Sequence, residues 1–314
     1  RGAKAPSSSS SSSSSVGVTS LTRRVRRVRV GSGPPARTAL PVRPSPLLLL
    51  PESTRQIATQ HIAVLLAQSK SEKQDVTAEA IMGTNALSRG AYRLRRWSYV
   101  AKVHMLAEKY GRGRDSRAQD RKDEARRIAA RAIALLQRLY TISRVKKLAE
   151  VTHVCACLWI STKLETQMTG KMLGCLGRFV DTAAQLELAD VYKCEREICR
   201  WLGWRLNPAT SYDIWSRLVE IMLPKDIVDR VAELASQLDV MCQRSLHSLD
   251  YAAHEIAISI LIVALRSLGL AEHYEQDILA FCGMGATCTE DEHERGAVSP
   301  QEAVWELACV LYVK

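Results

Sequence analysis

The sequence predicts an all-α protein: two consecutive five-helix bundles behind a disordered N-terminal tail. Helix-favouring Ala, Leu, Arg, Glu and Lys dominate its 314 residues, of which only 2 are Phe. From residue 87 onward, apolar side chains recur at the spacing of amphipathic helices, and no clear strand pattern interrupts them. The pattern stops at Asn207-Pro208, because proline cannot donate the next backbone hydrogen bond, and then it begins again.

The first 51 residues differ from the rest in composition. They contain nine basic residues and no acidic one, and nine consecutive serines occupy positions 7–15. Such a segment cannot bury enough apolar area to offset its ordering entropy, so residues 1–51 are predicted to be a disordered basic tail. A Ser- and Arg-rich start is also typical of organelle transit peptides, and that alternative stays open. Beyond the tail, 35 basic and 33 acidic residues nearly balance, so we expect no nucleic-acid binding by the folded part.

A leading helical segment is expected at residues 52–86, and the first bundle at residues 87–207. A polar stretch at 111–124 separates the first two helices of this bundle. A Thr-x-x-Gln capping box, Thr182 to Gln185, is expected to start the fifth helix. The predicted helices span about 87–110, 125–140, 146–164, 170–180, and from the capping box to about 204.

The second bundle is expected at residues 208–314. Its last helix should begin at Ser299-Pro300, an N-cap followed by proline at the first helical position. In each set the third helix is the most apolar, so the other helices should surround it. The predicted helices span about 210–222, 226–246, 250–268, 272–282 and 299–313.

Several classes of function find no support in the sequence. The nine cysteines form no CxxC pair, which argues against a zinc ribbon and favours reduced thiols. Cys155 and Cys157 should point to different faces of one helix and so cannot share an ion. No phosphate-binding loop or HExxH pattern is present, and no apolar run reaches the ~20 residues of a membrane span. We therefore expect a protein without catalytic residues, metal or cofactor, and no membrane partner.

Two charged residues interrupt the apolar stripes of the third and fifth helices. Lys163 follows Trp159 by four positions, and Glu195 follows Val191 by four. An unpaired buried charge would cost several kcal/mol, so three arrangements are open. The two side chains could pair inside the bundle, each could reach water at a helix end, or both could lie at the rim of an apolar surface and bind a partner.

Three segments resemble the cyclin family. ACLWISTKLET at 156–166 is similar to the end of the third cyclin-box helix, with its (A/S)-x-K-x-E signature. KCEREICRWLGWRLNPATSYDIW at 193–215 resembles the fifth helix and the exit of the box. YAAHEIAISILIVALRSLG at 251–269 resembles the central helix of the second, C-terminal box. The resemblance covers about residues 90–314.

The resemblance implies a regulatory subunit that binds and activates a cyclin-dependent protein kinase in cell-cycle control. The partner would be the kinase catalytic subunit, in a heterodimer in the nucleus or cytoplasm. By motif position, the side chains that contact the kinase would be Lys163, Glu195, Leu164, Cys199 and Leu206. The alternative is a cyclin-fold transcription factor or scaffold of the transcription factor IIB type, which would bind DNA or polymerase.

The first helix departs from the family pattern. Arg95 and Arg96 stand where the family has two apolar residues of a substrate-recruiting patch. In the family an Arg on this helix pairs with an Asp on the second helix. Arg93 takes the place of that Arg by sequence, and Gln137 takes the place of that Asp. The resemblance therefore implies no apolar docking at this patch.

Overall fold

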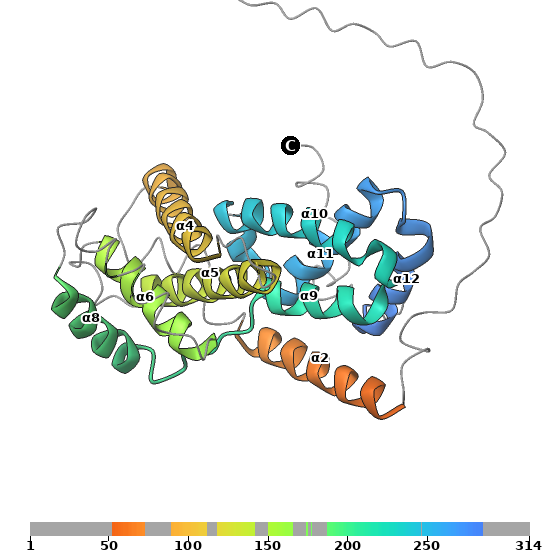
Figure 1. The fold of residues 1–314 in the computed structure, drawn as a ribbon, viewed down its shortest axis with the longest axis horizontal. Helices are drawn as coiled ribbons and strands as arrows, with labels where there is room; N and C mark the ends of the chain where they lie inside the picture. The colour runs from red at the N-terminus through yellow and green to blue at the C-terminus, as the bar shows by residue number, and fades with distance from the viewer. Residues whose placement is uncertain are drawn as a thin grey trace, which may run out of the picture. The chain divides into compact units, whose positions relative to one another are not determined.

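The structure of the chain, a computed structural model, describes residues 52–72, 89–111, 118–141, 150–165, 174, 177, 187–245 and 247–284. Helices account for the regular structure of these residues, and no strand occurs among them, so the predicted all-α class is confirmed (Figure 1). The helices are α2 (Glu52–Glu72), α4 (Arg89–Gly111), α5 (Ala118–Thr141), α6 (Glu150–Glu165), α8 (Leu188–Trp201), α9 (Ser211–Met222), α10 (Lys225–Arg244), α11 (Ala253–Ser267) and α12 (Ala271–Phe281), with a short 3-10 helix at His247–Asp250.

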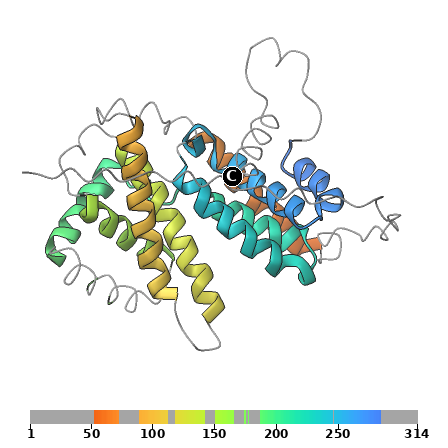
Figure 2. The ribbon, with the colours of Figure 1, turned by 90° about the horizontal axis from the view of Figure 1, so that it is seen from above.

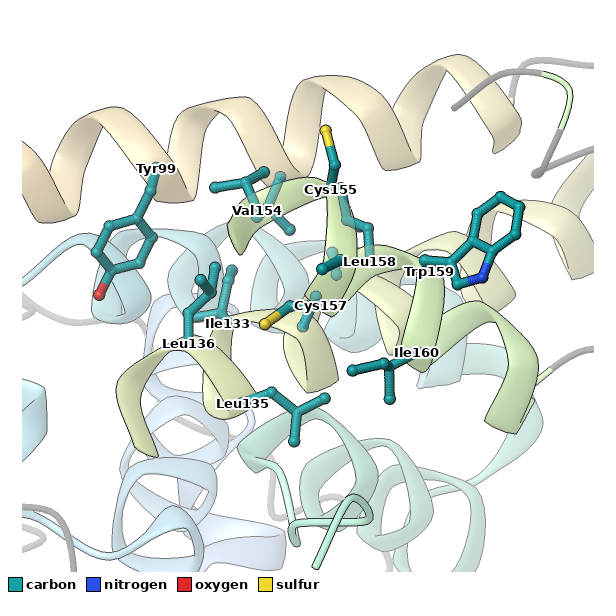
Figure 3. Close-up of a cluster of buried hydrophobic side chains, with 14 of the residues drawn as sticks. Tyr99, Ile133, Leu135, Leu136, Val154, Cys155, Cys157, Leu158, Trp159 and Ile160 are labelled. Atoms are coloured by element: carbon teal, nitrogen blue, oxygen red, sulfur yellow. The ribbon is translucent and has the colours of Figure 1, made fainter. Parts of the chain in front are cut away.

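One cluster of buried side chains joins α4, α5, α6 and α8. Tyr99 from α4 and Leu136 from α5 gather with Val154 and Leu158 from α6 (Figure 3). Every residue of α6 from 152 to 162 is buried, as the apolar pattern of this helix predicted. A helix apolar all round is stable only when neighbours cover all its faces, and here α4, α5 and α8 do so.

A second cluster joins α9, α10, α11 and α12. The central helix is α11, whose residues 257–265 are all buried. Helix α2 packs against α9 and α11, and its Ile62 is fully buried in this second cluster (Figure 1). The leading segment therefore contributes to the core of the C-terminal set, although it precedes the N-terminal set in sequence. The turned view in Figure 2 also shows α2 along the C-terminal helices.

The second set of helices follows the sequence-based expectation closely, whereas the first set requires corrections. Helix α5 begins at Ala118, so part of the polar stretch 111–124 is helical, and Asp120 lies in its first turn where the helix dipole favours an acid. Helix α8 begins at Leu188 with Glu187 as N-cap, not at the Thr182 capping box. The tail, the helices expected at 170–180 and 299–313, and the capping box lie outside the described residues, apart from positions 174 and 177.

Helix α8 ends at Trp201, earlier than the proline at 208 suggested. The N–H of Gly203 donates to the Arg200 carbonyl, and the N–H of Trp204 donates to the Cys199 carbonyl. These two bonds form a Schellman motif, which needs a left-handed residue after the helix, and Gly203 has a φ of 55°. The glycine therefore stops the helix before the proline can.

One buried position of α4 also differs from expectation. The helical spacing of Trp97, Val100 and Val103 favours burial of Trp97, but that side chain is 55% exposed. Arg96, one position earlier, is fully buried in line with Tyr99, Val100 and Val103. The apolar face of α4 thus contains an arginine. Among the described residues, no helix is both long and apolar enough to cross a membrane.

Candidate docking site

Lys163 and Glu195 bond to each other at the surface. Lys163 lies in the last turn of α6, and Glu195 lies near the middle of α8, which packs alongside. The Lys163 Nζ is 2.7 Å from Glu195 Oε1 and 2.9 Å from Oε2. The Lys163 side chain is 44% exposed and that of Glu195 is 16% exposed. The interpretation with the pair buried inside the bundle is therefore wrong, although the pairing itself occurs.

Aromatic rings beneath the pair fix the position of the ammonium group. The Nζ of Lys163 lies 5.4 Å from the centre of the Trp159 ring, within the range of a cation–π contact. The Trp159 ring in turn meets the edge of Tyr192, with ring centres 5.0 Å apart. Figure 3 shows Trp159 pointing away from Cys157, toward the outside of the cluster. Trp159 therefore lies between the buried core residues of α6 and the exposed Lys163–Glu195 pair.

The end of α6 is held from two sides. While Lys163 bonds α8, the carboxylate of Glu165 forms ion pairs with Arg131 and Arg127 of α5. Arg131 and Glu165 are both largely buried, with side chains 9% and 14% exposed. Residues 163 and 165 therefore connect the last turn of α6 to both neighbouring helices, which gives Lys163 a fixed backbone position.

The other predicted contact residues differ in exposure. Leu164 is 47% exposed beside Lys163, so it presents an apolar side chain at the surface next to the ion pair. Cys199 is 5% exposed, and burial raises the pKa of its thiol, so it presents a small apolar surface without a reactive thiolate. Leu206 is half-buried against the first core cluster. The structure brings Leu206 into the turn that follows α8, close in sequence to Cys199.

Trp204 belongs to the same turn, and the sequence analysis did not select it. Its side chain is 72% exposed, which is the highest exposed fraction among the large apolar side chains of the described residues. Its φ is 63°, a left-handed conformation that costs about 1–2 kcal/mol for a residue with a Cβ. The N–H groups of Trp204 and Leu206 donate to Cys199 O and Trp204 O, which fixes this turn. The L-x-W-x-L spacing in the quoted motif was the signal that could have identified it.

The Lys163–Glu195 pair retains unused capacity for hydrogen bonding. A lysine ammonium has three N–H donors, and Glu195 takes two of them. The third has no acceptor among the residues that the structure describes. Because the pair is exposed, it contributes at most about 1 kcal/mol to stability. A partner could therefore bond either group without a large loss of folding free energy.

Among the described side chains, the arginine that meets Gln137 is Arg96. With the Gln137 amide turned so that its oxygen faces the guanidinium, this oxygen accepts from Arg96 Nη2 at 2.9 Å and from Nη1 at 3.2 Å. The side chains of Arg93 and Arg95 lie outside the described residues. Since Arg96 is fully buried, it is not part of any surface patch.

The described cysteines are buried in the helical cores. None of the six described cysteines forms a disulfide, and burial raises the pKa of Cys155 and of Cys194 to about 12. Cys155 and Cys157 point in different directions, as their spacing predicted (Figure 3). Among the described residues, no group of His, Cys, Asp or Glu has the arrangement of a metal site.

No protein-family model matches the chain, and no curated protein matches it significantly. The protein is therefore classified by its fold and by the geometry of its candidate site. The described part is an all-helical protein in which an exposed ion pair adjoins exposed apolar side chains at the α6–α8 edge.

Proposed function

We propose that the chain is a regulatory subunit that binds and activates a cyclin-dependent protein kinase. The observation that carries the proposal is the α6–α8 edge, where the exposed Lys163–Glu195 pair lies beside exposed Leu164 and follows the motif spacing of the cyclin resemblance. An exposed Trp, a large apolar side chain and a charged pair together have the composition of an interface hot spot.

The interface would consist of a charged pair within an apolar surface. Leu164, Trp204 and the partly buried Leu206 would supply the apolar contacts. Lys163 would donate its third N–H to a backbone carbonyl of the kinase, and Glu195 would accept from a kinase donor. The bonds in place between Lys163 and Glu195 orient both groups before binding, which reduces the side-chain entropy lost on association.

Activation would follow from selective binding. A kinase is active only when a Lys–Glu ion pair joins its third strand to a mobile helix and its activation loop is ordered. A fixed helical surface that packs better against the active position of that helix shifts the population toward it. The size of this shift equals the difference in affinity for the two states, so a 100-fold preference supplies about 2.7 kcal/mol.

The test is to mix the purified chain with candidate cyclin-dependent kinases and to measure both affinity and histone phosphorylation. Lys163→Ala combined with Glu195→Ala should weaken binding at least tenfold, because it removes two charged contacts from the rim. Activation should fall in parallel.

A matched control is available on α9. Arg217 and Glu220 form another exposed ion pair, with Nη1 2.6 Å from Oε2, and belong to the C-terminal set. Alanine at both of these positions should leave binding unchanged. Equal loss in the two double variants would count against the α6–α8 edge, and failure of every candidate kinase to bind the unmodified chain would count against the function itself.

A further inference from the structure

A cavity of about 110 Å³ lies where the two sets of helices meet. The last turns of α2, the middle of α5 and the linker that follows Pro208 form one side of it, and the segment from Cys242 to Ile256 forms the other. Two arginines, Arg96 and Arg138, line it together with one acid, Glu72. A volume of this size holds several water molecules or one small oxyanion.

Arg138 and Glu72 neutralise each other. The Nη2 of Arg138 is 2.6 Å from Glu72 Oε1. The other oxygen of Glu72 accepts from the backbone N–H of Ala209 at 3.1 Å, and Gln68 donates to Oε1. The charge of Glu72 is therefore neutralised by Arg138, and no bond from Glu72 to Arg96 is present.

Arg96 is left with neutral partners only. Its Nε donates to the Gln243 carbonyl at 2.9 Å, and Nη2 donates to Ser248 Oγ at 3.1 Å and to Gln137. Nη1 reaches only the same Gln137 oxygen. A guanidinium has five N–H donors, so one on Nη1 has no acceptor among the described residues. No carboxylate of the described part lies within ion-pair distance of this fully buried cation.

A buried charge without a counter-charge costs several kcal/mol. The free Nη1 donor belongs to a side chain that lines a cavity, and the lining has one positive charge more than its acids neutralise. We propose that this cavity binds a small inorganic anion of phosphate or sulfate size, which accepts from Arg96 Nη1 and supplies the missing negative charge. The anion would then bridge the two sets of helices, because Arg96 comes from α4 and its present acceptors from α5, α10 and the turn at Ser248.

The test uses the full chain and sodium phosphate or sodium sulfate as probe. The melting temperature Tm is measured from 0.1 to 10 mM anion, with sodium chloride adjusted to hold the ionic strength constant. Specific binding gives a saturable rise in Tm, of about 3–11 °C when the anion exceeds its Kd tenfold to a hundredfold, because binding then supplies about 1.4–2.7 kcal/mol. Isothermal titration should give one site per chain.

Gln137→Glu is the decisive variant, because it adds a carboxylate beside Arg96 without changing the shape of the side chain. It should raise Tm in the absence of the probe and abolish the dependence on phosphate. A rise that does not saturate and is equal in both proteins would overturn the proposal, since it reports only general salt stabilisation. A Gln137→Glu protein less stable than the parent would also overturn it, because the arginine would then not lack a counter-charge.

Discussion

Arg96 and Lys163 are both cations within apolar helix stripes, yet they differ in solvent exposure and in the charge of their partners. Lys163 lies in the last turn of α6 and is 44% exposed beside a carboxylate. Arg96 lies in the second turn of α4, is fully buried, and bonds only neutral acceptors. A charge at a stripe position therefore does not show whether a helix face opens to solvent. The decisive factor is whether the neighbouring segments supply acceptors or leave a route to water.

The largest expected effect is at the buried cation. Arg96→Ala should lower the free energy of unfolding by about 3–5 kcal/mol, because it leaves a cavity and deprives Gln243 O, Ser248 and Gln137 of their donor. Urea unfolding followed by circular dichroism measures the loss.

Arg200 provides the matched control for this substitution. It lies on the exposed side of α8, and Arg200→Ala makes the same chemical change there. That variant should differ from the parent by less than about 0.5 kcal/mol. If both variants lost the same amount, the buried network around Arg96 would contribute nothing to stability.

An intermediate effect is expected from a buried carboxylate next to the same network. Asp239 on α10 accepts from Ser211 Oγ at 2.6 Å and from Gln243 Nε2 at 3.1 Å, and burial raises its pKa to about 6. In the unfolded chain this pKa returns to 3.8. Ionisation of Asp239 therefore lowers the free energy of unfolding. This loss is complete above pH 6 and absent below pH 3.8.

Asp239→Asn should accordingly stabilise the protein at pH 7.5, by about 2–3 kcal/mol when the Asn Oδ1 accepts from Gln243 Nε2 and its Nδ2 donates to the Ser211 hydroxyl oxygen, which reverses that bond. The advantage should shrink as the pH falls through 6 and vanish near pH 4. Unfolding of the two proteins across this range gives the difference directly. A difference that stays constant with pH would show that Asp239 titrates alike in the folded and unfolded states.

His104 contributes a pH dependence of opposite sign to the same network. Its Nε2 lies 2.8 Å from Gln243 Oε1, and burial lowers its pKa below 6.5. The stability that it contributes is present above pH 6.5 and is lost as the pH falls through its lowered folded value. Because both proteins retain His104, comparison of Asp239→Asn with its parent at each pH removes the part of this contribution that does not depend on the shared Gln243 side chain.

The sequence was sufficient for α9 to α12 of the C-terminal set because local signals mark their ends. Pro224 caps the start of α10, and Gly269 and Gly283, with φ of 70° and 71°, end α11 and α12. The end of α8 was misplaced because the pattern of apolar residues continues past Gly203, and only the hydrogen bonds of the turn show where the helix stops.

The sequence predicted which residues form the candidate site, but not how they are paired and exposed. The spacing placed Lys163 and Glu195 on neighbouring stripes, and their pairing was one of the arrangements that it left open. It could not show that both groups reach solvent, because this depends on the packing of α6 against α8. The resemblance placed Arg96 at a substrate-recruiting surface patch, and the helical spacing favoured burial of Trp97 instead. Tertiary acceptors from α10 and Ser248 reversed that preference.

The smallest expected effect is at the exposed pair. A double-mutant cycle with Lys163→Ala and Glu195→Ala should give a coupling free energy below about 1 kcal/mol for folding, because solvent screens the lysine. The same cycle measured on kinase binding should give a larger coupling, since both groups lose water at an interface. Coupling above about 2 kcal/mol in folding would identify the pair as a clamp between α6 and α8, and a partner would then have to break it. Weak coupling in the free chain is therefore the property that distinguishes a docking rim from a structural ion pair.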